Sequence, residues 1–104
     1  MNKWSFVGIP FVVDKATAFN KVCEVFELTP VQLRSRRRFR RNVDAKSALC
    51  YILHKKIKLT STEVAAYLSI NHATVLHHCK KAESLIEIDE DFKNKFKQLR
   101  ITYN

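Results

Sequence analysis

Apolar residues recur at three- and four-residue intervals along most of this chain, which is the spacing of one buried helix face. The pattern predicts an all-α fold of about six helices. We expect them at residues 14–28, over a few residues from position 30, at residues 42–57, in the two halves of a helical hairpin between residues 60 and 87, and through residues 92–99.

Residues that can accept hydrogen bonds from free backbone N–H groups mark the expected helix starts. Thr29 followed by Gln32, and Thr60 followed by Glu63, have the spacing of a capping box. Single caps are expected at Asp14, Asn42 and Asn71.

Each predicted helix has an apolar face that needs a partner. The helix at residues 42–57 has a continuous apolar face, so we expect it at the centre of the core. The residues expected inside are Phe19, Val22, Cys23, Phe26, Ala45, Ala48, Leu49, Ile52, Leu53, Val64, Leu68, Ile70, Val75, Cys79, Phe92, Phe96 and Leu99.

The hairpin between residues 60 and 87 has the features of a helix-turn-helix, although an ordinary helical hairpin is the simpler interpretation. Ala65 supplies a small residue where the two helices cross, and Ser69-Ile70-Asn71 supplies a compact turn. In a helix-turn-helix, the first turns of the second helix reach base edges in the major groove of DNA. The outward positions on those turns are His72, Ala73, Thr74 and His77.

Composition narrows the fold and the domain organisation. One Gly and two Pro among 104 residues are too few for the turns of a β-sandwich or barrel, and an apolar share of 46% supports a folded core. We expect one helical domain over residues 14–104. Residues 1–13 are expected to form a short extended apolar arm, for which a packed arm, a short strand and a contact for another protein all stay open.

Positive charge is concentrated around the hairpin. The net charge is +9, and residues 34–81 hold twelve Lys or Arg against two acidic residues. Residues 34–41, the basic segment, contain six of these arginines. Like charges this close repel one another, and phosphates are the usual counter-ions. The basic segment therefore favours nucleic acid, including a minor groove that arginines can enter; a nuclear localisation signal is the other interpretation.

Several other classes of function lack the residues they need. His77, His78 and Cys79 point in different directions on one helix, so they predict no metal site and no catalytic Cys–His pair. No long apolar span indicates a membrane anchor. Three cysteines without paired spacing are expected to be reduced core residues, which favours the cytoplasm and, with DNA binding, the nucleoid. We expect no cofactor and no small-molecule substrate.

Two blocks of sequence, Leu33-Arg-Ser-Arg-Arg-Arg38 and His72-Ala-Thr-Val-Leu-His-His-Cys-Lys-Lys81, carry a resemblance to a known family. They resemble the basic loop and the signature Asp-His-Thr-Thr-Val-Leu-His-Ala-Cys-Arg-Lys of the C-terminal DNA-binding domain of DnaA, the bacterial chromosomal replication initiator. That domain is a helix-turn-helix of the Trp-repressor-like class. The resemblance runs from Lys21 to about Leu85. It does not extend to an ATPase, because the only glycine, Gly8, lies in no phosphate-loop context.

The resemblance implies that the basic loop enters the minor groove while the signature helix reads the adjacent major groove. The departures from the family pattern include Asn71 in place of an aspartate, Ala73 in place of a threonine and Ser47 in place of a glutamine, and the turn is about one residue shorter. An amide at position 71 can donate to adenine, so the target sequence stays open. By position, the implied roles are the minor groove for Arg38 with Arg36 and Arg37 beside it, base contacts for His72 and Thr74, and a phosphate contact for Lys46.

We therefore expect a non-enzymatic, sequence-specific double-stranded DNA-binding protein that regulates transcription or replication on its own. A helical adaptor that binds a replication or transcription protein through the arm is the alternative, and single-stranded nucleic acid is disfavoured because few aromatics are expected outside the core. A homodimer formed through the arm stays open. The residues expected to bind DNA are Arg36, Arg37, Arg38, Arg40, Arg41, Lys46, Asn71, His72, Ala73, Thr74, His77, Lys80 and Lys81.

Overall fold

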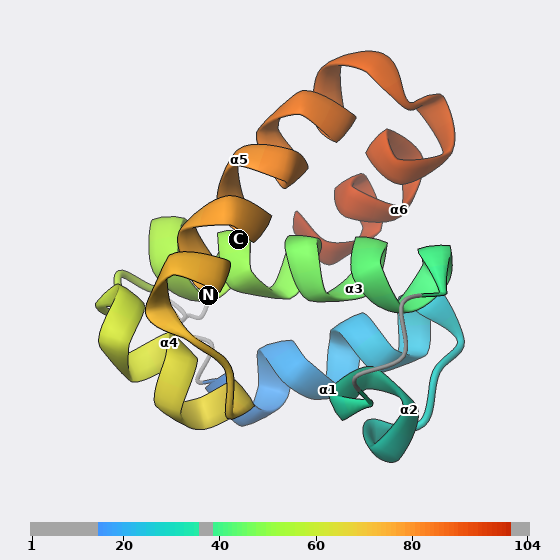
Figure 1. Cartoon of the computed structure of the whole chain (residues 1–104). Helices are drawn as coiled ribbons and strands as arrows, with labels where there is room; N and C mark the ends of the chain where they lie inside the picture. The colour runs from blue at the N-terminus through green and yellow to red at the C-terminus, as the bar shows by residue number, and fades with distance from the viewer. Residues whose placement is uncertain (1–14, 36–38, 101–104) are drawn as a thin grey trace, which may run out of the picture.

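The computed structural model describes residues 15–35 and 39–100, and these residues form an all-α fold (Figure 1). The prediction of six helices is confirmed over this part of the chain. The expected arm at residues 1–13 and the cap at Asp14 lie outside the described residues. The elements are α1 (Lys15–Phe26), α2 (Pro30–Arg34), α3 (Arg40–Tyr51), a π-helical turn η1 (Ile52–Lys56), α4 (Ser61–Leu68), α5 (His72–Ile88) and α6 (Glu90–Arg100).

Helix α3 is the centre of the fold, as its apolar face predicts. It packs against α1, α2 and α5, and Figure 1 shows it crossing the middle of the molecule between α1 and α5. Ala45, Ala48 and Leu49 are fully buried in that position. Helix α6 packs back on α1 and α5, as expected, and places Phe92 against Phe26 with their ring centroids 6.2 Å apart.

The predicted interior is confirmed with one exception. Every residue expected inside is buried except Ile70, which is half-buried in the turn before α5. Cys23, Cys50 and Cys79 are buried free thiols. Burial raises the pKa of the Cys50 thiol to about 12, so this residue stays protonated and behaves as a small apolar side chain.

Both predicted capping boxes are confirmed. Thr29 Oγ1 accepts from the Gln32 backbone N–H at 3.1 Å, and Gln32 Oε1 accepts from the Thr29 N–H at 2.8 Å. Thr60 and Glu63 make the same two bonds at 3.1 and 2.8 Å at the start of α4. These pairs satisfy N–H groups that a helix start leaves without intrahelical partners, which fixes where α2 and α4 begin.

The prediction that Asn42 caps the central helix is wrong. Helix α3 begins at Arg40, after Phe39, whose backbone is extended and whose side chain makes no capping hydrogen bond. Asn42 lies inside the helix and is 6% exposed, and its Nδ2 donates to the carbonyl of Gln32 at 2.9 Å. The amide therefore ties the start of α3 to α2 across the basic segment.

The end of the predicted helix at residues 42–57 also differs. The α-helix stops at Tyr51 and continues as η1, in which the Ile57 N–H bonds to the carbonyl of Ile52 at 2.9 Å. Lys58 then adopts a left-handed backbone with φ of 73°, which ends the helical run without a glycine. No helix between residues 15 and 100, leaving out 36–38, is both long and apolar enough for a bilayer crossing.

Candidate nucleic-acid interface

Helices α4 and α5 form the helix-turn-helix that the hairpin pattern indicates. Ser69 has a left-handed backbone with φ of 58°, and the Ile70 N–H returns to the carbonyl of Ala65 at 3.0 Å. Asn71 is the predicted cap, because its Oδ1 accepts from the Ala73 N–H at 2.8 Å. The turn is therefore closed by its own hydrogen bonds, and α5 begins at a defined residue.

The first two turns of α5 present an exposed surface, which we call the reading face. Its members are exposed except for Thr74, which is half-buried. Val75 and Cys79, on the opposite side of the helix, are buried against the core. The predicted outward positions His72, Ala73 and His77 are thus exposed, Thr74 is only partly so, and a packed core supports the helix behind them. The reading face consists of Asn71, His72, Ala73, Thr74 and His77.

His77 and His78 face different surroundings, although they are adjacent. His77 is exposed on the reading face, whereas His78 is 9% exposed and its Nδ1 lies 3.1 Å from Ser47 Oγ. Their side chains and that of Cys79 therefore do not converge. Across the described ranges, no group of three or more His, Cys, Asp or Glu side chains is arranged to hold a metal ion.

The basic segment contributes to the fold at its first residue. Arg34 lies over two aromatic rings, with Cζ 4.6 Å from the ring centroid of Phe19 and 5.0 Å from that of Tyr67. Its Nη1 also donates to the carbonyl of Tyr67 at 2.7 Å. Arg34 thus ties the end of α2 to α1 and to the last turn of α4 through cation–π contacts and a charge-assisted hydrogen bond.

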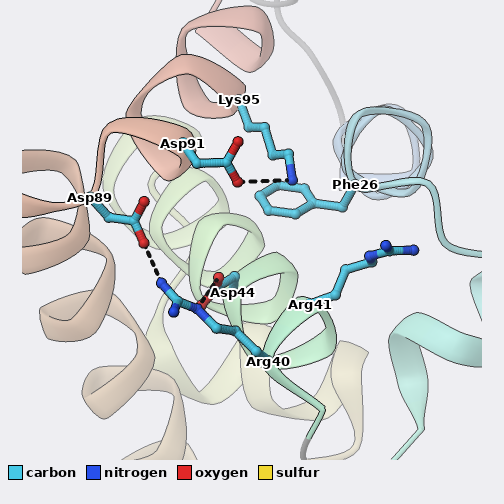
Figure 2. A pocket seen from close by; sticks show the side chains of 7 residues that line it. All are labelled: Phe26, Arg40, Arg41, Asp44, Asp89, Asp91 and Lys95. Carbon is cyan, nitrogen blue, oxygen red and sulfur yellow. Dashed lines mark hydrogen bonds and ion pairs between the residues drawn. The ribbon is translucent and has the colours of Figure 1, made fainter.

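Arg40, near the other end of the basic segment, is paired with two carboxylates. Its Nε lies 3.4 Å from Asp44 Oδ2, and its Nη2 bonds to Asp89 Oδ2. Figure 2 shows Arg40 reaching toward Asp89 while Arg41 points away from both acids. Burial raises the pKa of the Asp44 carboxyl, and the hydrogen bond from Arg40 opposes this shift. Arg40 therefore links α3 to the junction of α5 and α6.

The remaining predicted basic contacts differ in their exposure. Arg41 and Lys80 are exposed, and Lys81 is half-buried. Lys46 is half-buried, and its Nζ donates to the carbonyl of Ser35 at 2.5 Å, which holds the chain just before the region of Arg36, Arg37 and Arg38. Those three arginines lie outside the described residues.

Comparison with known protein families finds a match that includes this helix-turn-helix. The model of the family described as bacterial DnaA protein helix-turn-helix matches residues 17–82. The chain belongs to this family. The match covers most of α1, all of α2 to α4 and the part of α5 that holds the reading face. Membership of the DnaA helix-turn-helix family supports a DNA-binding role, and the match is to that domain of DnaA and not to its ATPase domain.

The relatives are chromosomal replication initiator proteins DnaA. Those of Bacteroides fragilis, Campylobacter jejuni and Aliarcobacter butzleri are each 28% identical to this chain, over 76, 80 and 75 residues. The aligned parts cover 72%, 76% and 71% of this chain. They cover 16%, 18% and 17% of the relatives, so the chain spans a small fraction of the length of the DnaA proteins it matches.

Sequence reasoning missed four features of this member of the DnaA family. One is the cap of α6 by Asp89, whose Oδ1 accepts the Phe92 N–H at 3.1 Å. An aspartate three residues before an apolar helical position is a local signal that could have predicted this cap. Another is Phe39, flanked by arginines, which is 60% exposed although the other phenylalanines that the structure describes are buried. The aromatic contacts of Arg34 and the bond between His78 and Ser47 join distant parts of the chain, so no local pattern indicates them.

Proposed function

We propose that this chain binds double-stranded DNA sequence-specifically, with the reading face in the major groove and the basic segment at the backbone and adjacent minor groove. The observation that carries the proposal is the reading face itself, on the capped start of α5. Four of its side chains are exposed and that of Thr74 is half-buried, while the other side of the helix is buried in the core. The width of the major groove admits one α-helix in this way.

Different residues supply the affinity for DNA and the preference for a base sequence. Arg41, Lys80 and Lys81, together with Arg36, Arg37 and Arg38, supply contacts to phosphates and to the minor groove. Arg40 and Lys46 are assigned phosphate contacts as well, in addition to the bonds that Arg40 makes to Asp44 and Asp89 and that Lys46 makes to the carbonyl of Ser35. Asn71, His72, Ala73, Thr74 and His77 supply the contacts to bases.

The biological role that follows is regulation without chemistry. A chain that carries a DnaA-type helix-turn-helix can occupy target sites and so regulate replication initiation or transcription through binding alone. It would act in the cytoplasm, at the nucleoid. One α5 contacts few base pairs, so two adjacent sites or a homodimer would increase the specificity.

Fluorescence anisotropy with a selected duplex, a scrambled duplex and a single strand tests this proposal across salt concentrations. Random-sequence selection with the wild-type chain supplies the selected duplex. Thr74→Ala should lower the preference for the selected duplex about tenfold, because one base contact is lost. Arg41→Ala should weaken both duplexes and lower the salt slope by about 0.9, as expected for one lost phosphate contact.

Lys97→Ala is the matched control for Arg41→Ala, because it removes one charge from an exposed position on α6. It should leave the salt slope and both affinities within about twofold, since only charges at the contacted backbone release counter-ions on binding. Absence of duplex binding at low salt would reject the proposal and favour the adaptor. Equal effects of Arg41→Ala and Lys97→Ala would reject the placement of the interface.

A further inference from the structure

The contact between α3 and α5 is the most extensive between helices in this fold, and it contains a buried polar pair. Ser47, on α3, is fully buried, and His78, on α5, is 9% exposed. Ser47 Oγ and His78 Nδ1 lie 3.1 Å apart. A polar group in such a place costs free energy unless it is hydrogen-bonded, so the geometry of this pair constrains how the two helices fit together.

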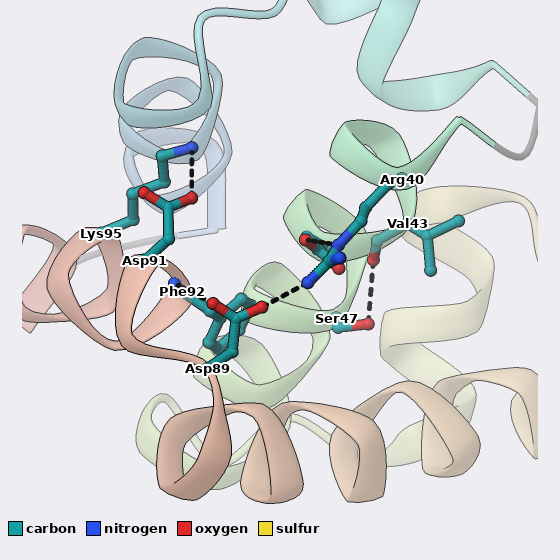
Figure 3. Close-up of polar contacts among 8 residues, drawn as sticks. Arg40, Val43, Ser47, Asp89, Asp91, Phe92 and Lys95 are labelled. Carbon is teal, nitrogen blue, oxygen red and sulfur yellow. Dashed lines mark hydrogen bonds and ion pairs between the residues drawn. The ribbon is translucent and has the colours of Figure 1, made fainter.

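The direction of the hydrogen bond follows from a second contact of Ser47. Its hydroxyl also lies 2.8 Å from the backbone carbonyl of Val43, one turn earlier on α3 (Figure 3). A hydroxyl has one proton, and a carbonyl can only accept. The Ser47 proton therefore goes to Val43, and Ser47 Oγ accepts the proton that His78 carries on Nδ1. This chain of bonds runs from α5 into the backbone of α3.

The position of the pair connects it with the reading face. His78 lies one helical turn after Thr74 and next to His77, so its ring anchors the part of α5 from which those two side chains project. Ser47 lies two turns into α3, the helix that begins inside the basic segment. The bond thus joins the reading face to the helix that leads out of the basic segment.

Both members of the pair also differ from the residues that the family resemblance implies at their positions. The signature has alanine where this chain has His78, and the family has glutamine where this chain has Ser47. A long side chain on α3 and a short one on α5 are thus exchanged for a short one on α3 and a long one on α5. In this chain, the hydrogen bond between Ser47 and His78 links α3 and α5 at this contact.

We propose that His78 and Ser47 are a positioning pair that sets the rotation and depth of α5 on α3, and thereby determines which base sequence the reading face accepts. The inference rests on the proposed DNA binding. Base readout needs donors and acceptors held within about 0.5 Å of the productive geometry, whereas phosphate contacts position the protein without reading sequence. Loosening the pair should therefore lower sequence preference and leave non-specific affinity in place.

The test compares variants by the ratio of their dissociation constants for a scrambled duplex and for the duplex selected by the wild-type chain. His78→Leu and Ser47→Ala should each lower this ratio about tenfold, with scrambled-duplex affinity within about twofold of wild type. His78→Asn should keep most of the ratio, because the asparagine amide can donate from nearly the position of Nδ1.

His54→Leu is the matched control. His54 lies in η1, and its Nδ1 is 2.8 Å from the carbonyl oxygen of Leu59 in the loop that follows. This variant therefore also removes a histidine hydrogen bond, but outside the contact between α3 and α5. It should lower Tm and leave the ratio unchanged. A folded His78→Leu or Ser47→Ala variant with the wild-type ratio would overturn the inference, and so would an equal loss of ratio in His54→Leu.

The double variant Ser47→Gln/His78→Ala introduces the family's residues at both positions. Each single change leaves either a clash or a cavity, whereas the double change restores one long and one short side chain. Its Tm should lie closer to wild type than that of either single variant, and random-sequence selection should give a different preferred sequence. An unchanged preferred sequence would count against the inference.

A measurement without DNA separates this inference from the proposed function. Long-range ¹H–¹⁵N correlation spectra should show His78 protonated at Nδ1 in the wild-type chain, and a changed Nδ1 signal in Ser47→Ala. If the wild-type chain shows no preference among duplexes, the proposed function and the specificity role fall together. If preference is present and Nδ1 of His78 carries no proton, the positioning pair alone is wrong.

Discussion

Helices α5 and α3 of this domain begin in different ways, and each start positions a different part of the candidate interface. Helix α5 starts on a cap from its own turn, Asn71, just as α2 and α4 start on capping boxes. Helix α3 starts after Phe39 with no side-chain cap, and Asn42, Lys46 and Arg40 hold it through bonds to α2, to Ser35 and to Asp89. The start of α5 is thus fixed by neighbouring residues, and the start of α3 by tertiary contacts.

Because of this difference, removing a local cap and removing a tertiary anchor should lower the free energy of unfolding by unequal amounts. When a local cap is removed, the exposed N–H groups can bond to water instead. When a tertiary anchor is removed, a buried polar group is often left without any hydrogen-bond partner. Loss of an anchor should therefore cost more than loss of a cap, and it should disturb more of the molecule.

The largest effect is expected for Asn42→Ala. The change removes a buried amide and its hydrogen bond to Gln32, so the free energy of unfolding should fall by about 2 kcal/mol. Urea denaturation followed by circular dichroism measures this fall. Thr29→Ala, which removes a local cap from α2, should cost about 1 kcal/mol. Equal costs for the two variants would contradict the distinction between anchors and caps.

Asp89→Ala should have the next largest effect, because Asp89 is both a helix cap and a tertiary anchor. It caps α6 through the Phe92 N–H and pairs with Arg40 on α3. The lost cap alone should cost about 1 kcal/mol, and the lost pair adds to it. Asp89→Asn keeps the capping oxygen and removes the charge, so thermal unfolding should show a smaller fall in Tm. Equal falls for the two variants would mean that the cap contributes nothing.

Asn71→Ala should cost about 1 kcal/mol, because it removes only the cap of α5. Asn71→Ser restores a capping oxygen and should recover most of the loss. Hydrogen exchange should localise the change to the first turn of α5, with α3 protected as in wild type. Faster exchange throughout α3 would show that the start of α5 is not a local feature.

The smallest effect is expected at Glu63 and depends on pH. Hydrogen bonds from Thr60 lower the pKa of this carboxylate in the folded chain below its ordinary value. A lowered folded pKa gives stability that is present above the unfolded pKa and is lost as pH falls through the folded one. The Tm difference between wild type and Glu63→Gln should therefore be present at pH 7 and shrink toward pH 3. A difference that grows on acidification would contradict the assigned role.

The extent to which the sequence predicts this structure follows the same division. The helices, the capping boxes and the outward positions of α5 depend on residues within four positions of one another, and the pattern of apolar and polar residues records them. The start of α3 depends on more distant residues. Gln32 lies ten residues from Asn42, and Asp89 lies 49 residues from Arg40. Such pairs form only after the fold brings them together.

The candidate interface shows this limit most clearly in its basic residues. The concentration of arginine predicts a surface for phosphate, but it cannot tell which arginine has another role. Arg34 stacks on the ring of Tyr67, 33 residues away, and donates to its carbonyl. His78 bonds to a serine 31 residues away. Each of these roles depends on helix packing, which no spacing within the basic segment or α5 reveals.

The most direct test of the account is to map the DNA interface by NMR on the ¹⁵N-labelled chain, titrated with its selected duplex. If α5 reads DNA, the largest amide shifts should fall on residues 71–77 at the start of α5 and on residues 34–41, with small shifts along α6. The reverse result, with the largest shifts on α6 or α1 and residues 71–77 unperturbed, would contradict the assignment of α5 as the helix that reads DNA.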